Sequence, residues 1–118
     1  MTPGQWKKNL ASIEKKINID FGNSFVLFQR YNRNDKEAVY IYEHANKKHI
    51  ITLFFFNPIN GISFVDVSFI EKTNDHSTIK GPNKLLKKIE LDIEQEDEII
   101  SKFRGFTREI ELKGIFEK

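Results

Sequence analysis

The stretch that decides the fold is residues 38–56, which read AVYIYEHANKKHIITLFFF. Its first part, Ala38 to Ala45, alternates tyrosine with valine and isoleucine, the period of two that is typical of a β-strand. Its last part, His49 to Phe56, is rich in β-branched and aromatic residues. The Asn46-Lys47 pair between them forms a short turn, and so short a connection makes the two strands antiparallel. Residues 38–56 therefore predict a β-hairpin.

Further strands lie on both sides of this hairpin. Before it, Phe25 to Tyr31 is rich in β-forming residues, and residues 32–36 are a polar turn cluster. After it, residues 57–61 end in Asn-Gly, a strong hairpin signal, and Ile62 to Glu71 forms the next strand. Because the connections are short, we expect these strands to pair with their neighbours in a meander.

The N-terminal segment predicts a helix over residues 3–19. Thr2 is the candidate N-cap, Pro3 suits the first helical position, and Gln5 completes a capping box. The apolar residues of this segment recur at helical spacing, at Trp6, Leu10, Ile13 and Ile17. We expect Trp6 to be buried where the helix packs on the sheet.

The C-terminal third is more ambiguous. Residues 72–83 are the longest polar stretch and predict a loop. Residues 88–94 alternate as a strand does, although a helix face would also fit Leu85, Leu86, Ile89 and Ile93. Leu91, which no helix face explains, favours the strand. Residues 94–106 begin with acidic side chains that suit a helix N-terminus, and residues 110–116 alternate again and predict a last strand.

These elements predict an α+β fold. We expect one antiparallel sheet of five to six strands, arranged as a meander, with the N-terminal helix packed on one face and a short second helix before the last strand. A chain of 118 residues is of ordinary size for one domain, so we take residues 1–118 as a single α+β domain.

The composition excludes several classes of protein. The chain has no cysteine, which rules out a disulfide scaffold, a thiol nucleophile and a cysteine zinc finger. A net charge of +2 is too near balance to require a nucleic acid or an anionic membrane as partner. The longest apolar run, residues 50–56, is far shorter than the ~20 residues of a membrane span, and no signal peptide precedes it. We therefore expect a cytoplasmic protein. Phenylalanine, isoleucine, lysine and asparagine, which AT-rich codons encode, are frequent, and this bias is compatible with a low-GC bacterium or one of its mobile elements as the source.

Two histidines are the first candidates for a chemical site. If Asn46-Lys47 is a two-residue turn, His44 lies directly opposite His49, with their Cβ atoms roughly 5 Å apart. Zinc takes four ligands, and nothing in the sequence places His76 or Asp75 beside this pair. The simpler interpretation is a solvated pair beside a hairpin turn, so we predict no metal site.

A short motif raises the alternative of a nuclease. Glu111-Leu112-Lys113 has the form Glu-x-Lys, which some metal-dependent nucleases place on a strand beside an aspartate, here Asp66 or Asp92. The carboxylates would hold Mg²⁺ and the lysine would stabilise charge at the attacked phosphate. Glu14-Lys15-Lys16 has the same form on the predicted helix, and such triplets arise by chance in a chain rich in lysine and glutamate. Nuclease activity is therefore our third choice.

No glycine-rich nucleotide loop and no Gly-x-Ser-x-Gly motif is present, so we predict no cofactor and no catalysis.

Binding of single-stranded nucleic acid is the second choice. The predicted first helix has a basic flank made of Lys7, Lys8, Lys15 and Lys16. Basic and aromatic side chains follow one another in the segment that contains Phe28, Arg30, Tyr31 and Arg33. Proteins that bind single strands combine such rings with a basic groove. The low net charge, the scarcity of arginine and the lack of an aromatic-glycine RNA motif argue against it.

The aromatic residues of the sheet favour protein binding. Phe54, Phe55 and Phe56 are consecutive and therefore point to both faces, whereas the predicted helices would cover only one. By parity, Tyr40 and Tyr42 share a face with His44, His49, Ile51, Leu53 and Phe55. An aromatic face of this kind is a normal protein-binding surface. We predict a non-catalytic protein-binding module, of the class of small bacterial immunity or inhibitor-type proteins that neutralise a partner such as a toxin.

The predicted partner-binding residues are Arg30, Tyr31, Arg33, Tyr40 and Tyr42. The tyrosines would be the anchors, and the arginines would pair with acidic groups of the partner. If the tyrosines are buried, the binding surface moves to the acidic segment at residues 94–98 or to the loop at residues 72–83.

Overall fold

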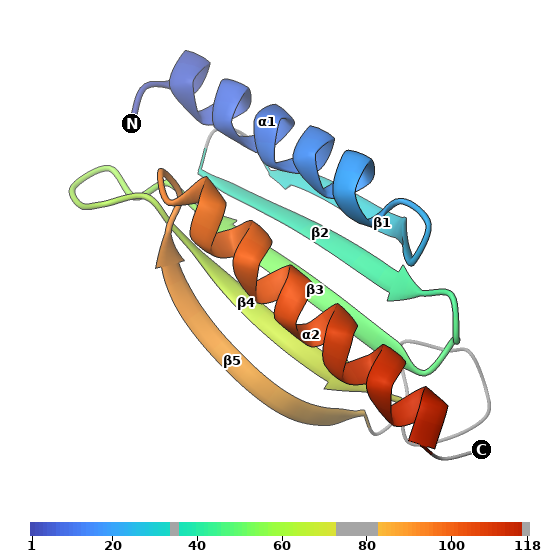
Figure 1. The fold of residues 1–118 in the computed structure, drawn as a ribbon. Coiled ribbons are helices and arrows are strands. Elements are labelled where there is room, and N and C mark those ends of the chain that lie inside the picture. Colours follow the sequence, from blue (N-terminus) through green and yellow to red (C-terminus); the bar gives the residue numbers. More distant parts are fainter. Residues whose placement is uncertain (34–35, 73–82, 117–118) are drawn as a thin grey trace.

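The structure, a computed structural model, describes residues 1–33, 36–72 and 83–116, with the backbone alone at Arg33 and at residues 113–116. The predicted α+β fold with an antiparallel meander is confirmed (Figure 1). In chain order the elements are α1 (Pro3–Phe21), β1 (Phe25–Arg33), β2 (Glu37–His44), β3 (His49–Phe56), β4 (Phe64–Glu71), β5 (Lys84–Asp92) and α2 (Glu96–Phe116).

The five strands form one sheet in the order in which they occur in the chain, and every neighbouring pair is antiparallel. The predicted hairpin of residues 38–56 is β2 and β3, in which Tyr40 pairs with Leu53. Bulges interrupt the outer pairs, between Leu27 and Gln29 in β1 and at Leu86 in β5, opposite Phe69 and Ile70 of β4. Short connections thus produce the meander, as the sequence predicted.

The first helix begins as its capping box predicts. The Thr2 side chain accepts a hydrogen bond from the backbone N–H of Gln5 at 3.2 Å, and the Gln5 side chain accepts one from the N–H of Thr2 at 3.2 Å. Trp6 is 2% exposed and its ring meets that of Phe55 edge-on, with centroids 6.4 Å apart. The predicted burial of Trp6 between helix and sheet is confirmed.

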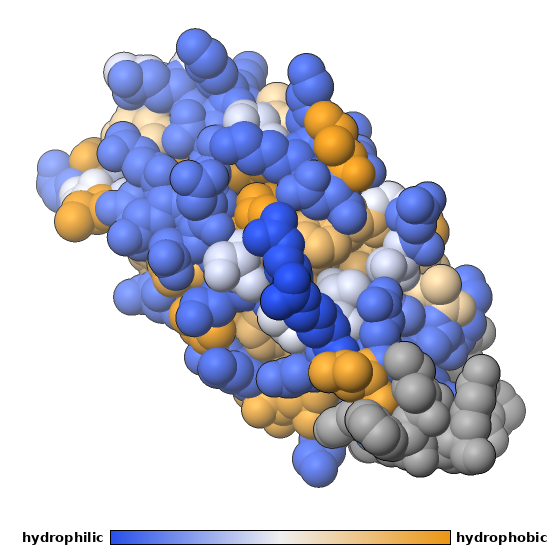
Figure 2. All heavy atoms as spheres, viewed as in Figure 1, coloured by the Kyte–Doolittle hydropathy of each residue, from blue (hydrophilic) through white to orange (hydrophobic). Residues whose placement is uncertain are grey.

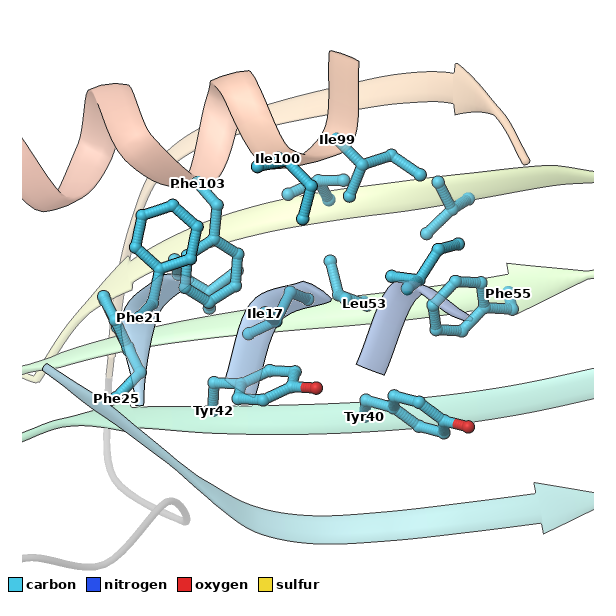
Figure 3. Close-up of a cluster of buried hydrophobic side chains, with 14 of the residues drawn as sticks. Ile17, Phe21, Phe25, Tyr40, Tyr42, Leu53, Phe55, Ile99, Ile100 and Phe103 are labelled. Carbon is cyan, nitrogen blue, oxygen red and sulfur yellow. The ribbon is translucent and has the colours of Figure 1, made fainter. Parts of the chain in front are cut away.

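Both helices pack on the same face of the sheet (Figure 1). Between them and the strands lies an apolar core that includes Ile17, Leu53, Ile99 and Phe103 (Figure 3). The Phe103 ring lies 4.9 Å from that of Phe21, which joins the two helices. Seen from this side, the outer surface of the helices is mostly hydrophilic (Figure 2). No helix of the described chain combines the length and apolar character needed to cross a membrane.

The C-terminal third differs from the prediction in one element. Residues 84–92 are a strand, β5, as Leu91 indicated. The second helix, however, continues to Phe116, so the predicted last strand over residues 110–116 is wrong. Ile110 extends the buried face of the helix by one further turn and is 6% exposed, whereas Leu112 is 54% exposed. The predicted loop lies mainly at residues 73–82, outside the described residues.

Candidate functional site

The side of the sheet away from α1 and α2, here called the open face, is covered by no helix among the described residues (Figure 1). Residues that pair directly across strands point to the same side, so the register identifies the side chains of this face. One row of paired residues crosses all five strands at Tyr31, Val39, Phe54, Asp66 and Glu90. Tyr31 is 48% exposed and Phe54 is 40% exposed. This row is therefore apolar over β1–β3 and carries carboxylates on β4 and β5.

The next row of the open face contains two aromatic rings and a concave surface. Phe56 pairs with Phe64, and their rings stack with centroids 5.0 Å apart. Two hollows of about 220 Å³ and 420 Å³ are both lined by Glu37 and Phe56. Val39 and Phe54 also line the smaller hollow. This end of the open face can accommodate a protruding side chain.

The opposite end of the open face carries a buried ion pair. The Lys72 Nζ atom lies 2.6 Å from the Glu43 Oε2 atom, and the two side chains are 1% and 7% exposed. Lys47 Nζ approaches the other carboxylate oxygen of Glu43 at 3.1 Å. Burial alone would raise the pKa of Glu43, but hydrogen bonds from Lys72 and Lys47 outweigh it and lower the pKa. Glu43 is thus ionised at neutral pH, and its charge is neutralised by the chain itself.

Two predicted anchors, Tyr40 and Tyr42, are not on the surface. They are 3% and 0% exposed, and their rings pack against Phe55 and Phe103 (Figure 3). Burial raises the pKa of both phenols, and the Tyr42 hydroxyl has no hydrogen-bond partner in the described part of the chain. The expectation that these tyrosines are exposed is wrong. They share a face as parity predicted, but this is the face that the helices cover.

The other three predicted partner-binding residues do not form one patch. Arg30 pairs with Tyr40 across the strands and so points to the helix side, where its Nη1 atom lies 2.9 Å from Oε1 of Glu14. Tyr31, the next residue, is on the open face. Arg33 ends β1, and its side chain is outside the described part of the structure. The structure therefore leaves Tyr31 alone as an exposed anchor from this set.

The histidine pair lies beside the turn, as predicted, but the expectation that it is solvated is wrong. His44 is 8% exposed and its ring packs against that of Phe25, and the His49 side chain is 15% exposed. β2 ends at His44 and β3 begins at His49, and the ring centroids are 6.5 Å apart. The His44 Nδ1 atom accepts a hydrogen bond from the backbone N–H of Asn46 at 3.0 Å, and burial lowers the pKa of His44. His49 Nε2 lies 3.9 Å from the Glu71 carboxylate. Within the described residues, no three histidine, aspartate or glutamate side chains are arranged to hold a metal ion.

The carboxylates of the nuclease alternative are not brought together. Glu111 lies on α2, not on a strand, and accepts a hydrogen bond from the Ser24 hydroxyl at 3.3 Å. Asp66 lies on the open face, on the other side of the sheet, with Lys88 Nζ 3.8 Å away. Asp92 accepts a hydrogen bond from the backbone N–H of its neighbour Glu94 at 2.9 Å. The expected strand arrangement of Glu-x-Lys beside an aspartate is therefore wrong.

The acidic segment at residues 94–98, the alternative binding surface, contributes one of its carboxylates to contacts within the fold. Glu96 Oε2 lies 2.7 Å from Lys16 Nζ and accepts a hydrogen bond from the Ser12 hydroxyl at 3.3 Å. These contacts join the start of α2 to α1. The other alternative surface, the loop, falls mainly on residues 73–82, outside the described residues.

Val39 and Phe54 are the residues that sequence reasoning missed. Their signal was present, because Phe54 flanks Phe55 and must point to the opposite side of the sheet. Parity separates the two faces but does not identify the one that the helices cover.

Comparison of the chain with protein families, with curated proteins and with solved structures found no match.

Proposed function

We propose that this protein is a non-catalytic module that binds another protein through the open face of its sheet. The observation that carries the proposal is the exposed row of Tyr31, Val39 and Phe54, on a face that no described helix covers. In biological terms, we propose a small bacterial immunity or inhibitor-type protein that acts in the cytoplasm and neutralises a partner such as a toxin.

The open face of the sheet differs from an ordinary solvent-facing sheet. An antiparallel sheet with one face in the core usually presents polar side chains on the other face. Here the other face exposes Val26, Tyr31 and Phe54, which are 65%, 48% and 40% exposed. Large apolar side chains left exposed on the face of a sheet, such as Tyr31 and Phe54, are typical of interaction sites. Covering it with a partner removes that surface from water, and aromatic side chains contribute most per residue.

The surroundings of this row favour a protein partner with basic groups at its edge. The hollow beside Glu37 and Phe56 can receive a partner side chain. Asp66 and Glu90 lie in the same row as Phe54, on β4 and β5. Lys88 already approaches Asp66 at 3.8 Å, so the exposed Glu90 is the group that would favour a basic side chain on the partner. Charges at the edge of an interface mainly set the association rate and the salt dependence.

Single-stranded nucleic acid is the second candidate, because exposed rings on a sheet can also stack with bases. Tyr31 and Phe54 would be the rings on the open face. The basic flank of the first helix lies on α1, however, on the other side of the sheet (Figure 1). The charged residues of the Tyr31–Phe54 row are Asp66, which Lys88 approaches at 3.8 Å, and Glu90, so this row offers phosphates no cation of its own. Protein binding is therefore the better-supported proposal.

The test has two stages. Tagged wild-type protein is first used to capture partners from its native host, and the captured protein is identified by mass spectrometry and purified. Its affinity is then measured for the wild type and for Tyr31→Ala, Phe54→Ala and the double variant. We expect each single change to weaken binding by about 2 kcal/mol, the size of a hot-spot effect. The matched control is Ile19→Ala, because Ile19 is 70% exposed on α1, on the other side of the molecule.

Circular dichroism establishes that each variant is folded. Unchanged affinity in the folded double variant would overturn the assignment of the open face. Binding of single-stranded DNA or RNA at about 50 mM salt, lost in the same double variant and weakening steeply with added salt, would replace the proposal by the second candidate.

A further inference from the structure

The loop between β3 and β4 carries the Asn60-Gly61 pair at its exposed tip. It projects beyond the end of the sheet (Figure 1), and its tip shows apolar atoms among hydrophilic ones (Figure 2). The base of the loop is fixed, because the Ser63 hydroxyl donates a hydrogen bond to the Asn57 Oδ1 atom at 2.6 Å and both residues are buried. Residues 58–62, between these two anchors, are all exposed. Asn60 is therefore open to water on a loop whose ends are held in place.

Asparagine is chemically labile because its side chain can react with the backbone of the next residue. The next backbone nitrogen attacks the side-chain Cγ atom, a C–N bond forms, and the C–NH₂ bond breaks. Ammonia leaves with the proton of the attacking nitrogen, and a five-membered succinimide ring remains. Water then opens the ring at either carbonyl and gives aspartate or isoaspartate. The reaction therefore needs a following nitrogen that carries a hydrogen, is free of hydrogen bonds and has no bulky side chain beside it.

The backbone nitrogen of Gly61 meets these three conditions. Among the described residues, neither the Gly61 N–H nor the Asn60 side chain takes part in a hydrogen bond. Glycine has no Cβ atom to block the approach of its nitrogen to the Asn60 Cγ atom. Both reacting groups are thus available on the exposed tip.

The asparagines of three other exposed or turn positions do not meet these conditions. Asn23 is exposed as well, but the N–H of Ser24 donates a hydrogen bond to the last carbonyl of α1 at 2.9 Å. The N–H of Lys47, which follows Asn46, donates to the last carbonyl of β2 at 2.9 Å. Asn57 precedes a proline, whose nitrogen carries no hydrogen. The hydrogen bonds of the fold therefore distinguish the loop tip from these positions.

We propose that Asn60 is a site of spontaneous deamidation, which proceeds through a succinimide formed with the nitrogen of Gly61 and consumes only water. The product changes the surface of the tip. Ile59 and Ile62 are 79% and 71% exposed, the two highest values among the large apolar side chains of the described residues. Deamidation places a carboxylate between them in the sequence. With time, the reaction converts a neutral apolar tip into a negatively charged one.

The experiment incubates the purified whole chain in mildly alkaline buffer made with water enriched in heavy oxygen. Peptides are then quantified by mass spectrometry. The peptide that contains Asn60 should gain the mass difference between –NH₂ and –OH, incorporate heavy oxygen and contain isoaspartate at that position. The rate should rise with pH, because the attacking nitrogen must lose its proton. The peptides that contain Asn23 and Asn46 should stay unchanged over the same period.

Ser24→Gly is the matched variant, because it gives Asn23 the same following residue as Asn60. The N–H at that position still donates to the end of α1, so Asn23 should react at least about tenfold more slowly than Asn60, a difference of about 1.4 kcal/mol in the barrier. Asn60→Gln should abolish the modification of the loop, because glutamine would have to form a six-membered ring. Circular dichroism establishes that both variants are folded.

Two results would overturn the proposal. One is that Asn60 of the folded wild type reacts no faster than Asn23 and Asn46, which would mean that the folded loop protects it. The other is that Asn23 of folded Ser24→Gly reacts as fast as Asn60, which would mean that the Asn-Gly sequence alone, and not the free N–H of the loop tip, sets the rate.

Discussion

Glu43 and Lys72 show how a charge on the sheet can be structural. The pair is buried, and Glu43 also contacts Lys47, whose side chain is 71% exposed. Lys72 depends on Glu43 for its ion pair within the described residues, whereas Glu43 has two cationic partners. Removing one member of a buried pair is costly because the other charge stays in a medium of low polarity. The two residues are therefore unequal in their importance for stability.

Substitution of each residue by methionine tests this inequality. Glu43→Met leaves the buried Lys72 ammonium group without its ion-pair partner and should lower the free energy of unfolding by about 3–5 kcal/mol. Lys72→Met leaves Glu43 paired with Lys47 and should cost clearly less. The double variant should be more stable than Glu43→Met alone, because no buried charge is left without a partner. Urea denaturation followed by the fluorescence of Trp6, the single tryptophan, gives all three values. Equal losses in the two single variants would contradict the argument.

At the scale of elements, α2 is where local pattern and tertiary packing disagreed. Residues 110–116 alternate as a strand would, yet they continue the helix. The buried residues of the preceding turns recur at helical spacing, at Ile99, Ile100, Phe103 and Phe106. Ile110 falls four residues after Phe106 and extends this apolar face onto the core, so helix formation buries one further large side chain.

A helix and a strand over residues 110–116 predict different effects of alanine substitution on stability. In the helix, Ile110 is 6% exposed and Leu112 is 54% exposed, whereas a strand would place both on one face. Ile110→Ala should therefore cost about 2–4 kcal/mol of stability, and Leu112→Ala less than about 0.5 kcal/mol. Thermal or urea denaturation of the two variants distinguishes the helix from the strand. Comparable losses from both substitutions would support the strand.

At the scale of the whole molecule, acid should destabilise the fold in two steps. Burial lowers the pKa of His44 below 6.5, so between that folded-state value and 6.5 the unfolded chain binds more protons. This contribution to stability is complete above pH 6.5 and is lost as the pH falls. The hydrogen bonds of Lys72 and Lys47 lower the pKa of Glu43 below 4.5, despite its burial, so its contribution is complete above pH 4.5 and is lost below it.

The free energy of unfolding, measured by urea denaturation as a function of pH, should therefore be level above about pH 7 and decline in two pH windows. The upper window begins near pH 6.5 and belongs to His44, and the lower one begins near pH 4.5 and belongs to Glu43. His44→Gln should remove the decline in the upper window and leave the lower one. The slope for one proton is at most about 1.4 kcal/mol per pH unit. An unchanged slope in the upper window of His44→Gln would show that another group titrates there.

The arrangement of the molecule, with two helices on one face, also determines where the candidate site lies. The core cluster includes residues of both helices and the inward side chains of the strands. The exposed aromatic row is consequently on β1–β3, facing away from both helices (Figure 1).

The sequence by itself determined the elements whose signals are local. The capping box at Thr2 and Gln5, the alternation in β2 and the turn before His49 each depend on neighbours within a few residues. Parity likewise placed Tyr40 and Tyr42 on one face and Phe54 on the other. Only the tertiary structure decided which of these faces is covered, because both are apolar and the choice depends on where α2 packs, far along the chain. The same long-range packing turned residues 110–116 into helix, since burial of Ile110 stabilises a turn that local alternation does not specify.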